Sequence, residues 1–190
     1  MAAYEPESDR HGSSIPIRPL LQAVRDQYLL SWTGTHGIGH WARVHTNGIE
    51  LAAGTGADPL VLLLFAVFHD ACRKNEASDD DHGARGAELA LRCRGRYYEL
   101  DDRRFSLLYK ACAGHTVARW HPDLTVQACW DSDRLDLARV GIEPNPTRLG
   151  SDAARSLIER ASERARHRTV PDLVHGEWAT IARPRRSDLG

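Results

Sequence analysis

A histidine and an aspartate stand side by side at the end of the most hydrophobic segment of the chain. His69 and Asp70 directly follow nine consecutive apolar residues, 60–68. Burying two such polar side chains without partners is unfavourable. A divalent cation removes this cost, because it binds both imidazole nitrogen and carboxylate oxygen. The helix dipole alone favours a histidine at a helix C-terminus but disfavours an aspartate there, so the pair predicts a metal site.

Three further histidines, of the ten in the chain, fall where a helical pattern turns side chains inward. His40 and His82 each begin a segment with helical periodicity, and His115 continues the apolar stripe of another. One buried histidine is more often a structural residue than a ligand. Four of them together with carboxylates favour a metal cluster, in which His40, His69, Asp70, His82 and His115 are candidate ligands.

Two aspartates in a later helical segment offer a further carboxylate ligand. Asp131 and Asp133 are about 200° apart around a helix, so they cannot share one face. Asp131 lies on a helix face that carries both polar and apolar residues. Asp133 lies on an apolar face with Val126, Cys129, Trp130, Leu137 and Val140. We expect Asp133 to be the ligand and Asp131 to support the ligands or contact the substrate, although the sequence leaves the choice between the two open.

Basic residues follow the doublet on what we expect to be a loop. Arg73 and Lys74 could hold the oxygens of a phosphate group, but a solvated polar loop explains them equally well. Arg85, one helical turn beyond His82, is a similar candidate. The acidic run 79–81 is more typical of a helix cap than of a metal site.

The elements that must position these residues are helices. Apolar residues recur at spacings of three and four, and strict alternation is hard to find, which predicts an all-α fold. Asp58 and Pro59 are a helix-start signal for the apolar segment that ends at the doublet. A helix that is apolar on every side lies centrally, so the doublet should lie inside the structure or in a cleft. The other expected helices cover about 40–53 (ending before Gly54), 81–95, 101–115, 124–140 and 152–167.

A chain of 190 residues suits one domain. Residues 1–14 are polar without a helical period and are expected to form a disordered leader. We expect the domain to span 15–168 and a basic C-terminal tail to span 169–190, in which Trp178 could cover the core or a partner. The four cysteines form no closely spaced pair, which predicts reduced core thiols.

Charge and hydropathy restrict the partners. The 25 basic and 26 acidic residues nearly cancel, which disfavours long nucleic acid as a partner. No apolar run is long enough to cross a membrane, and no secretory signal is present, so we expect a cytoplasmic protein without membrane contact.

A small phosphorylated molecule is the expected substrate, and the oligomeric state is not defined.

The ordered set of these residues resembles the HD superfamily of metal-dependent phosphohydrolases. The counterparts are His40 within HWARV, the His69-Asp70 doublet within LLLFAVFHD, and Asp133 within SDRLD. The similarity runs from about residue 36 to residue 144. It implies a compact single-domain helical bundle of the HD type, with a divalent metal ion (Mn, Co, Mg, Fe or Ni) held by these four side chains.

The resemblance also bears on the number of ions. His82 within DHGARGAEL and His115 within ACAGHT fall where some branches of the superfamily place histidines that hold a second metal. Asp70 would then bridge two ions. In single-metal branches, histidines at these places contact the substrate phosphate instead, and the sequence leaves one and two ions equally open.

The implied activity is hydrolysis of a small phosphorylated metabolite or nucleotide through a metal-activated water. Asp70 would be a ligand and possible proton acceptor, His115 could protonate the leaving oxygen if it is not a ligand, and Arg73 and Lys74 would hold phosphate. One alternative is a di-iron oxygenase that uses the same ligand set. Another is a catalytically silent helical regulatory module, against which the intact ligand residues argue.

Overall fold

The computed structural model describes residues 15–180, and within this range it contains helices and no strand. The α-helices are α1 (Ile17–Arg25), α2 (Ile38–Thr55), α3 (Pro59–Phe68), α4 (His82–Cys93), α5 (Asp102–Gly114), α6 (Leu124–Arg134), α7 (Asp152–Ser156) and α8 (Ile158–Arg166). Short 3-10 turns are η1 (Leu137–Val140), η2 (Pro146–Arg148) and η3 (Asp172–Val174). The expected all-α fold is confirmed. The expected leader, 1–14, and the last ten residues of the tail lie outside the described range.

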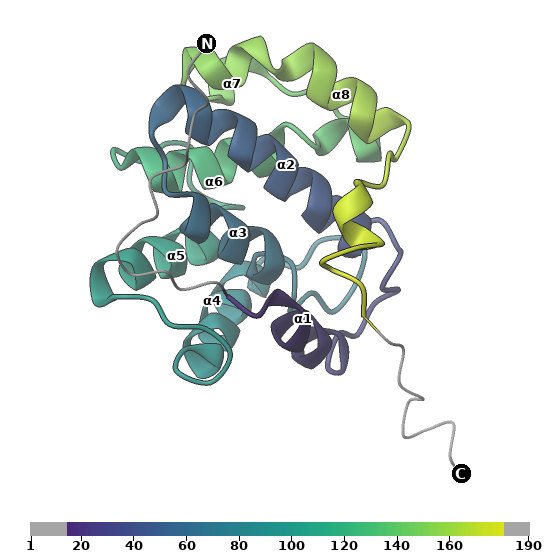
Figure 1. Cartoon of the computed structure of the whole chain (residues 1–190). Coiled ribbons are helices and arrows are strands. Elements are labelled where there is room, and N and C mark those ends of the chain that lie inside the picture. Colours follow the sequence, from purple (N-terminus) through teal and green to yellow (C-terminus); the bar gives the residue numbers. More distant parts are fainter. Residues whose placement is uncertain (1–14, 181–190) are drawn as a thin grey trace, which may run out of the picture.

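The apolar segment forms the central helix, α3, which packs against α2, α4, α5 and α6 (Figure 1). It begins as expected, because the Asp58 carboxylate accepts hydrogen bonds from the amides of Leu60 and Val61. Its C-cap is His69, which is fully buried, and Asp70 follows it with 2% of its surface exposed. The chain therefore carries both polar residues of the doublet into the interior.

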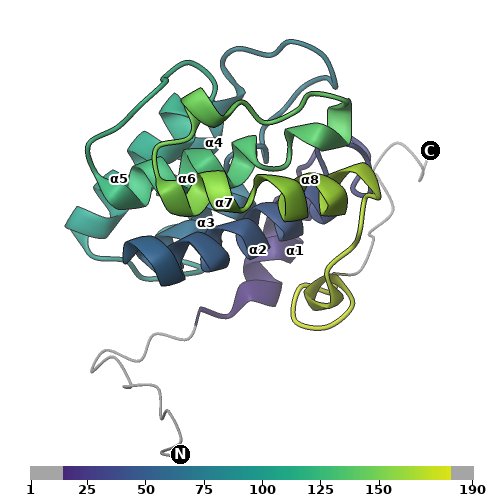
Figure 2. The ribbon, with the colours of Figure 1, turned by 90° about the horizontal axis from the view of Figure 1, so that it is seen from above.

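The remaining helices surround α3 on two sides. α4 and α5 pack together on one side, and α7 and α8 lie along α2 and α6 on the other, as Figures 1 and 2 show. No helix among residues 15–180 is long and apolar enough to cross a membrane. The four cysteines are unpaired thiols, of which three are buried, in agreement with the expectation from their spacing.

Three helix boundaries differ from those expected. α2 extends to Thr55 and ends at Gly56 with φ of 73°, rather than before Gly54. The helix expected over 124–140 ends at Arg134 and is followed by the 3-10 turn η1. Between them, the side chain of the buried Asp136 is directed toward α2. The helix expected over 152–167 divides into α7 and α8 because Leu157 turns into the core. Tertiary contacts override the local helical pattern at both breaks.

The C-terminal segment after α8 packs over α1 and α2. Trp178 is 2% exposed and lies against the ring of His45, while Arg18 donates to the carbonyls of Gly176 and Glu177. Trp178 thus covers the core. His45 is half-buried, because a segment distant in sequence covers it.

Burial of His45 predicts a specific loss of stability in acid. Burial lowers the pKa of His45 to about 4, and its Nδ1 atom has no partner among the described residues. The unfolded chain therefore binds a proton more readily than the folded chain as pH falls below 6.5, so stability is lost between about pH 6.5 and pH 4. Relative to wild type, H45F should gain about 2 kcal/mol of unfolding free energy on going from pH 7 to pH 5. Urea unfolding of both proteins at the two pH values measures this, and equal pH dependence would contradict it.

Candidate metal centre

Two histidines follow the ends of helices and are held there by backbone carbonyls. His69 directs Nδ1 to the Phe65 and Ala66 carbonyls, each at 3.1 Å. His115, the C-cap of α5, directs Nδ1 to the Cys112 carbonyl at 2.8 Å. A carbonyl accepts but does not donate, so both rings carry their hydrogen on Nδ1 and leave a lone pair on Nε2.

Two further histidines lie at helix N-termini and are oriented in the same way. His40, in the first turn of α2, directs Nδ1 to the Asp136 carboxylate at 2.7 Å. His82, the first residue of α4, directs Nδ1 to the carbonyl of Asp79. A hydrogen-bond acceptor at the nitrogen that does not bind the metal, here Nδ1, is the usual support of a metal-bound histidine, because it fixes both the tautomer and the ring orientation.

Close helix packing brings the four rings together. A Cβ atom at Gly86 would lie 2.3 Å from the carbonyl oxygen of Phe68, and one at Gly83 would lie 2.4 Å from that of Cys112. Only glycine at these two positions lets α4 approach the end of α3 and the end of α5 so closely. The approach places His82 beside His115.

The Nε2 atoms of the four histidines face one another in two pairs. Nε2 of His40 lies 3.0 Å from Nε2 of His69, and Nε2 of His82 lies 2.9 Å from Nε2 of His115. With the hydrogens held on Nδ1, each pair brings two lone pairs together without a donor between them. A cation shared by each pair satisfies these nitrogens, so the donor set fits a bound metal.

Asp70 lies between the two histidine pairs. Its Oδ2 atom is 3.5 Å from Nε2 of His40 and 3.7 Å from Nε2 of His69. Its Oδ1 atom is 3.0 Å from Nε2 of His82 and 3.9 Å from Nε2 of His115. One carboxylate oxygen therefore faces each pair, so Asp70 could supply a ligand atom to an ion held by either pair.

Within residues 15–180, the six expected ligands form two groups that could each hold an ion. Asp133, in the last turn of α6, places Oδ1 3.5 Å from Nε2 of His40. In each group the ligand atoms all lie within 4.8 Å of one another, and the groups are His40, His69 and Asp133, and Asp70, His82 and His115.

The electrostatics keep His69 and the two carboxylates in metal-binding protonation states, whereas Asp70 outweighs burial at His82 and raises its pKa. Burial lowers the pKa of His69 to about 3, so its ring is neutral at neutral pH. Burial alone would raise the pKa of Asp70, but the neighbouring His69, His40 and His82 hold it well below its usual value. The pKa of Asp133 is likewise lowered, because His69 and His40 outweigh the effect of burial. Neutral imidazoles and ionised carboxylates are the forms that bind metal.

Asp131, the other candidate carboxylate, points away from the histidines. It accepts hydrogen bonds from Nε2 of Gln127 at 2.8 Å and from the amide of Gly150 at 2.9 Å. Burial raises its pKa. Asp131 therefore ties α6 to the chain before α7, while the side chain of Asp133 is 17% exposed and faces the histidines.

The two aspartates provide a matched pair of variants. D133N should lose the ion held with His40 and His69 and should lower any metal-dependent activity at least about 100-fold. D131N should keep its metal and lose only about 1–3 kcal/mol of stability, because buried hydrogen bonds are disturbed. Elemental analysis and urea unfolding measure both effects. Metal loss in D131N with metal retained in D133N would reverse the assignment.

Comparison with known proteins bears on the fold. No family model matches the chain, and no curated protein matches it. A predicted HD superfamily hydrolase from an uncultured Thermotogales bacterium has a solved structure that matches at a TM-score of 0.60 and 24% identity, covering 87% of this chain and 95% of that chain. The chain has an HD-type fold. The fold implied by the sequence resemblance is therefore confirmed.

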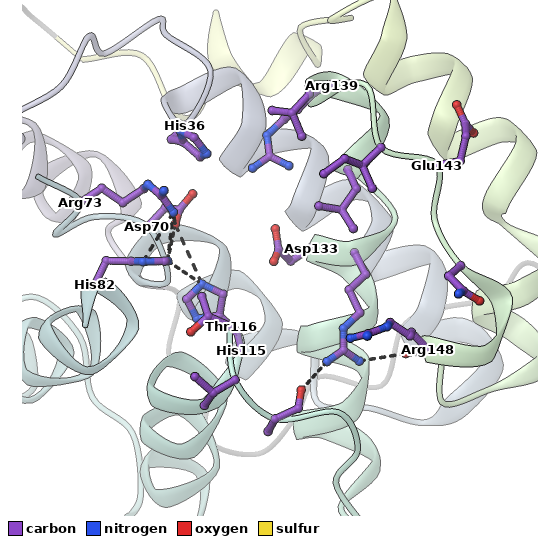
Figure 3. Close-up of a pocket in the computed structure, with 17 residues that line it drawn as sticks. His36, Asp70, Arg73, His82, His115, Thr116, Asp133, Arg139, Glu143 and Arg148 are labelled. Atoms are coloured by element: carbon purple, nitrogen blue, oxygen red, sulfur yellow. Dashed lines mark hydrogen bonds and ion pairs between the residues drawn. The ribbon is translucent and has the colours of Figure 1, made fainter. Parts of the chain in front are cut away.

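A cavity of about 480 Å³ opens above the ligands of this HD-type fold (Figure 3). Its floor includes Asp70, His82, His115 and Asp133, which the figure shows converging from separate elements. Its walls carry arginines and exposed aliphatic side chains, namely Arg73, Arg134, Arg139, Arg148, Val117, Val140 and Ile142. The cavity is large enough for a small organic molecule and carries excess positive charge on its walls.

Of the expected phosphate-binding residues, the structure brings one to the cavity. Arg73 is 9% exposed, with Nη1 3.4 Å from Oδ1 of Asp70 and Nη2 donating to the carbonyl of Ala77. Lys74 is exposed and does not line the cavity, because the inward turn of Arg73 directs the next residue outward. Arg85 is also outside it, since its guanidinium is bound by the Asp79 carboxylate. The structure therefore does not bring Lys74 or Arg85 to this cavity, and their expected contact with phosphate stays a prediction.

Sequence reasoning missed several residues of the site. Asp136 is fully buried and binds both His40 and Arg43, whose Nε donates to it at 2.7 Å. Its position three residues after Asp133 was the signal that could have identified it. His36 lies on the loop before α2, is 7% exposed, pairs with Glu76 and lines the cavity. Arg139 also lines the cavity.

Proposed function

We propose that this protein is a metal-dependent phosphohydrolase of the HD superfamily that acts on a small phosphorylated metabolite or nucleotide. The observation that carries the proposal is the position of Asp70, with one carboxylate oxygen toward each pair of inward-facing histidine nitrogens. The HD-type fold supports the proposal. The matched structure is itself described as a predicted hydrolase of this superfamily.

The ligand chemistry narrows the choice of metal. Each group combines two imidazole nitrogens with one carboxylate. Imidazole suits transition metals, whereas magnesium prefers oxygen ligands and retains most of its waters. Mn, Fe, Co and Ni therefore suit the groups better than Mg, and the bridging position of Asp70 favours two ions over one.

The chain's own residues prepare the cavity for a phosphate ester. A bound divalent ion would supply a nucleophile by lowering the pKa of a coordinated water. The ionised Asp70 holds the two ligand groups together, and the positive charge of Arg73 beside it would stabilise a phosphoryl group bound in the cavity. Buried side chains enclose the floor and limit access of bulk water to the reacting group.

Proton acceptance in the cavity is better suited to His36 than to His115. Both nitrogens of His115 are engaged, one by the Cys112 carbonyl and the other within the ligand group. His36 lines the cavity and pairs Nδ1 with the Glu76 carboxylate, and burial lowers its pKa, so its neutral ring presents a lone pair on Nε2 that can accept a proton there. His115 thus serves as a ligand in this proposal.

Activity assays on the purified protein test the proposal. We expect phosphate release from a panel of nucleotides and sugar phosphates after loading with Mn, Co or Fe, and loss of release after chelation. H69A should be inactive. H167A, at an exposed histidine, should match wild type. Oxygen consumption by the iron-loaded protein without phosphate release would contradict hydrolysis and favour the oxygenase alternative.

A further inference from the structure

Arg139 is a buried cation whose guanidinium is only partly used by the protein. It lies in η1, its side chain is 6% exposed, and it lines the cavity. Nε donates to the carbonyl of Thr35 and Nη1 donates to the carbonyl of Asp136, each at 3.2 Å. Nη2 has no hydrogen-bond partner among residues 15–180. Figure 3 shows the guanidinium directed into the cavity, between His36 and Asp133.

A structural role accounts for only part of this arrangement. The contact with Thr35 fixes Arg139 against the loop before α2, and Oδ2 of Asp136 lies 3.8 Å from Nε. A guanidinium remains charged in a protein and carries five donors, so the donors that the protein leaves unused are met by water or by a ligand in the cavity. The remaining N–H groups of Arg139 face the cavity, where an acceptor from outside the chain can reach them.

A second arginine of the cavity shows what a purely structural guanidinium looks like in this fold. Arg134 donates to the carbonyls of Ala118, Arg119 and Arg148 at distances of 2.6–3.1 Å. Both of its terminal nitrogens are thereby bound to backbone that lines or borders the cavity. Arg139 differs because its terminal nitrogen Nη2 remains available.

Arg73 and Arg139 flank the two ligand groups from different sides. Arg73 lies within 3.5 Å of the His82 ring and beside Asp70. Arg139 lies near Asp133, whose pKa it helps to lower. Figure 3 shows the two guanidinium groups on separate walls, with the carboxylates of the floor below them. Each ligand group thus has its own arginine.

We propose that Arg139 is a substrate-binding residue that holds an oxyanion through its available Nη2, while Arg73, whose nitrogens are bound by Asn75, Asp70 and Ala77, adds positive charge from a second wall. Guanidinium groups bind phosphoryl oxygens through fixed, charge-assisted hydrogen bonds. Two such cations on separate walls of one cavity match a terminal phosphoryl dianion, as in a phosphomonoester, better than the single charge of a diester. The assignment to a monoester rests on the proposed function, whereas anion binding by Arg139 does not require turnover.

Calorimetric titration with inorganic phosphate tests the inference. The protein is used as purified, and its metal content is measured in parallel. R139Q should bind phosphate about 10–100-fold more weakly than wild type, the loss expected for a charge-assisted hydrogen bond, with unchanged metal content. R139K keeps the positive charge but lacks the planar guanidinium, so its affinity for phosphate should lie between those of R139Q and wild type. R139K replaces R139Q in the titration if R139Q does not fold.

Arg164 provides the matched control. Its side chain is 21% exposed and bonds to Glu50 and Asn47, and it is absent from the cavity lining. R164Q should therefore bind phosphate as wild type does.

Three outcomes would overturn the inference. They are absence of phosphate binding to wild type, equal affinity in R139Q and wild type, and parallel loss of metal and phosphate in R139Q, which would make Arg139 a positioning residue for the ligands. If phosphate binding depends on Arg139 but no ester is hydrolysed, the proposed function fails while the inference stands.

Discussion

H82A is expected to reduce the bound metal from two ions to one per chain and to lower hydrolysis at least about 100-fold. His82 belongs to the group with Asp70 and His115, and its Nε2 lies 3.0 Å from Oδ1 of Asp70. Removing this nitrogen leaves two protein ligands for that ion. The other group keeps His40, His69 and Asp133, so its ion should remain.

Elemental analysis of gel-filtered protein, combined with phosphate-release kinetics, measures both effects. H175A, at an exposed histidine outside the cavity, is a suitable control and should keep both ions. The single-ion alternative makes a different prediction, in which H82A keeps its full metal content and only catalysis falls. That result would remove the bridging role assigned to Asp70.

D136A is expected to have the largest effect on stability, about 3–5 kcal/mol, because it leaves a buried charge without its partner. Asp136 is fully buried and accepts hydrogen bonds from Nε and Nη2 of Arg43 at 2.7 and 3.0 Å. It also accepts a hydrogen bond from Nδ1 of His40, which fixes the tautomer of this candidate ligand. Metal affinity should therefore fall about 10–100-fold as well.

Urea unfolding with and without a chelator separates the two effects of D136A. The stability loss should persist in the chelator, because the Arg43 charge is buried whether or not metal is bound. D152N, at an exposed aspartate that pairs with Arg155, should change stability by less than about 0.5 kcal/mol. A D136A protein as stable as D152N in chelator would contradict the account.

The sequence was most informative where a few neighbouring residues carry the signal by themselves. The start of α3 at Asp58 and Pro59 could be predicted because the capping interaction is local. The doublet could be singled out because polar residues are rare at the end of an apolar helix. The ordered ligand set added Asp133, whose choice over Asp131 is consistent with its position beside His40.

What could not be predicted depends on contacts between distant segments. The break after α6 follows from the binding of Asp136 by His40 and Arg43, almost a hundred residues earlier in the chain. His45 is covered by Trp178, which no local pattern indicates. Arg139 could not be selected among the many arginines, because its role depends on the loop carbonyl of Thr35 and on the direction of its guanidinium.

The metal content of D70A tests the central claim most directly. Asp70 is the one residue that faces both pairs of histidines, so its removal should disturb both groups. Wild type, loaded with manganese or iron and passed through a desalting column, should retain two ions per chain. Folded D70A, checked by circular dichroism, should retain less than one. Retention of the full wild-type metal content by folded D70A would contradict the account.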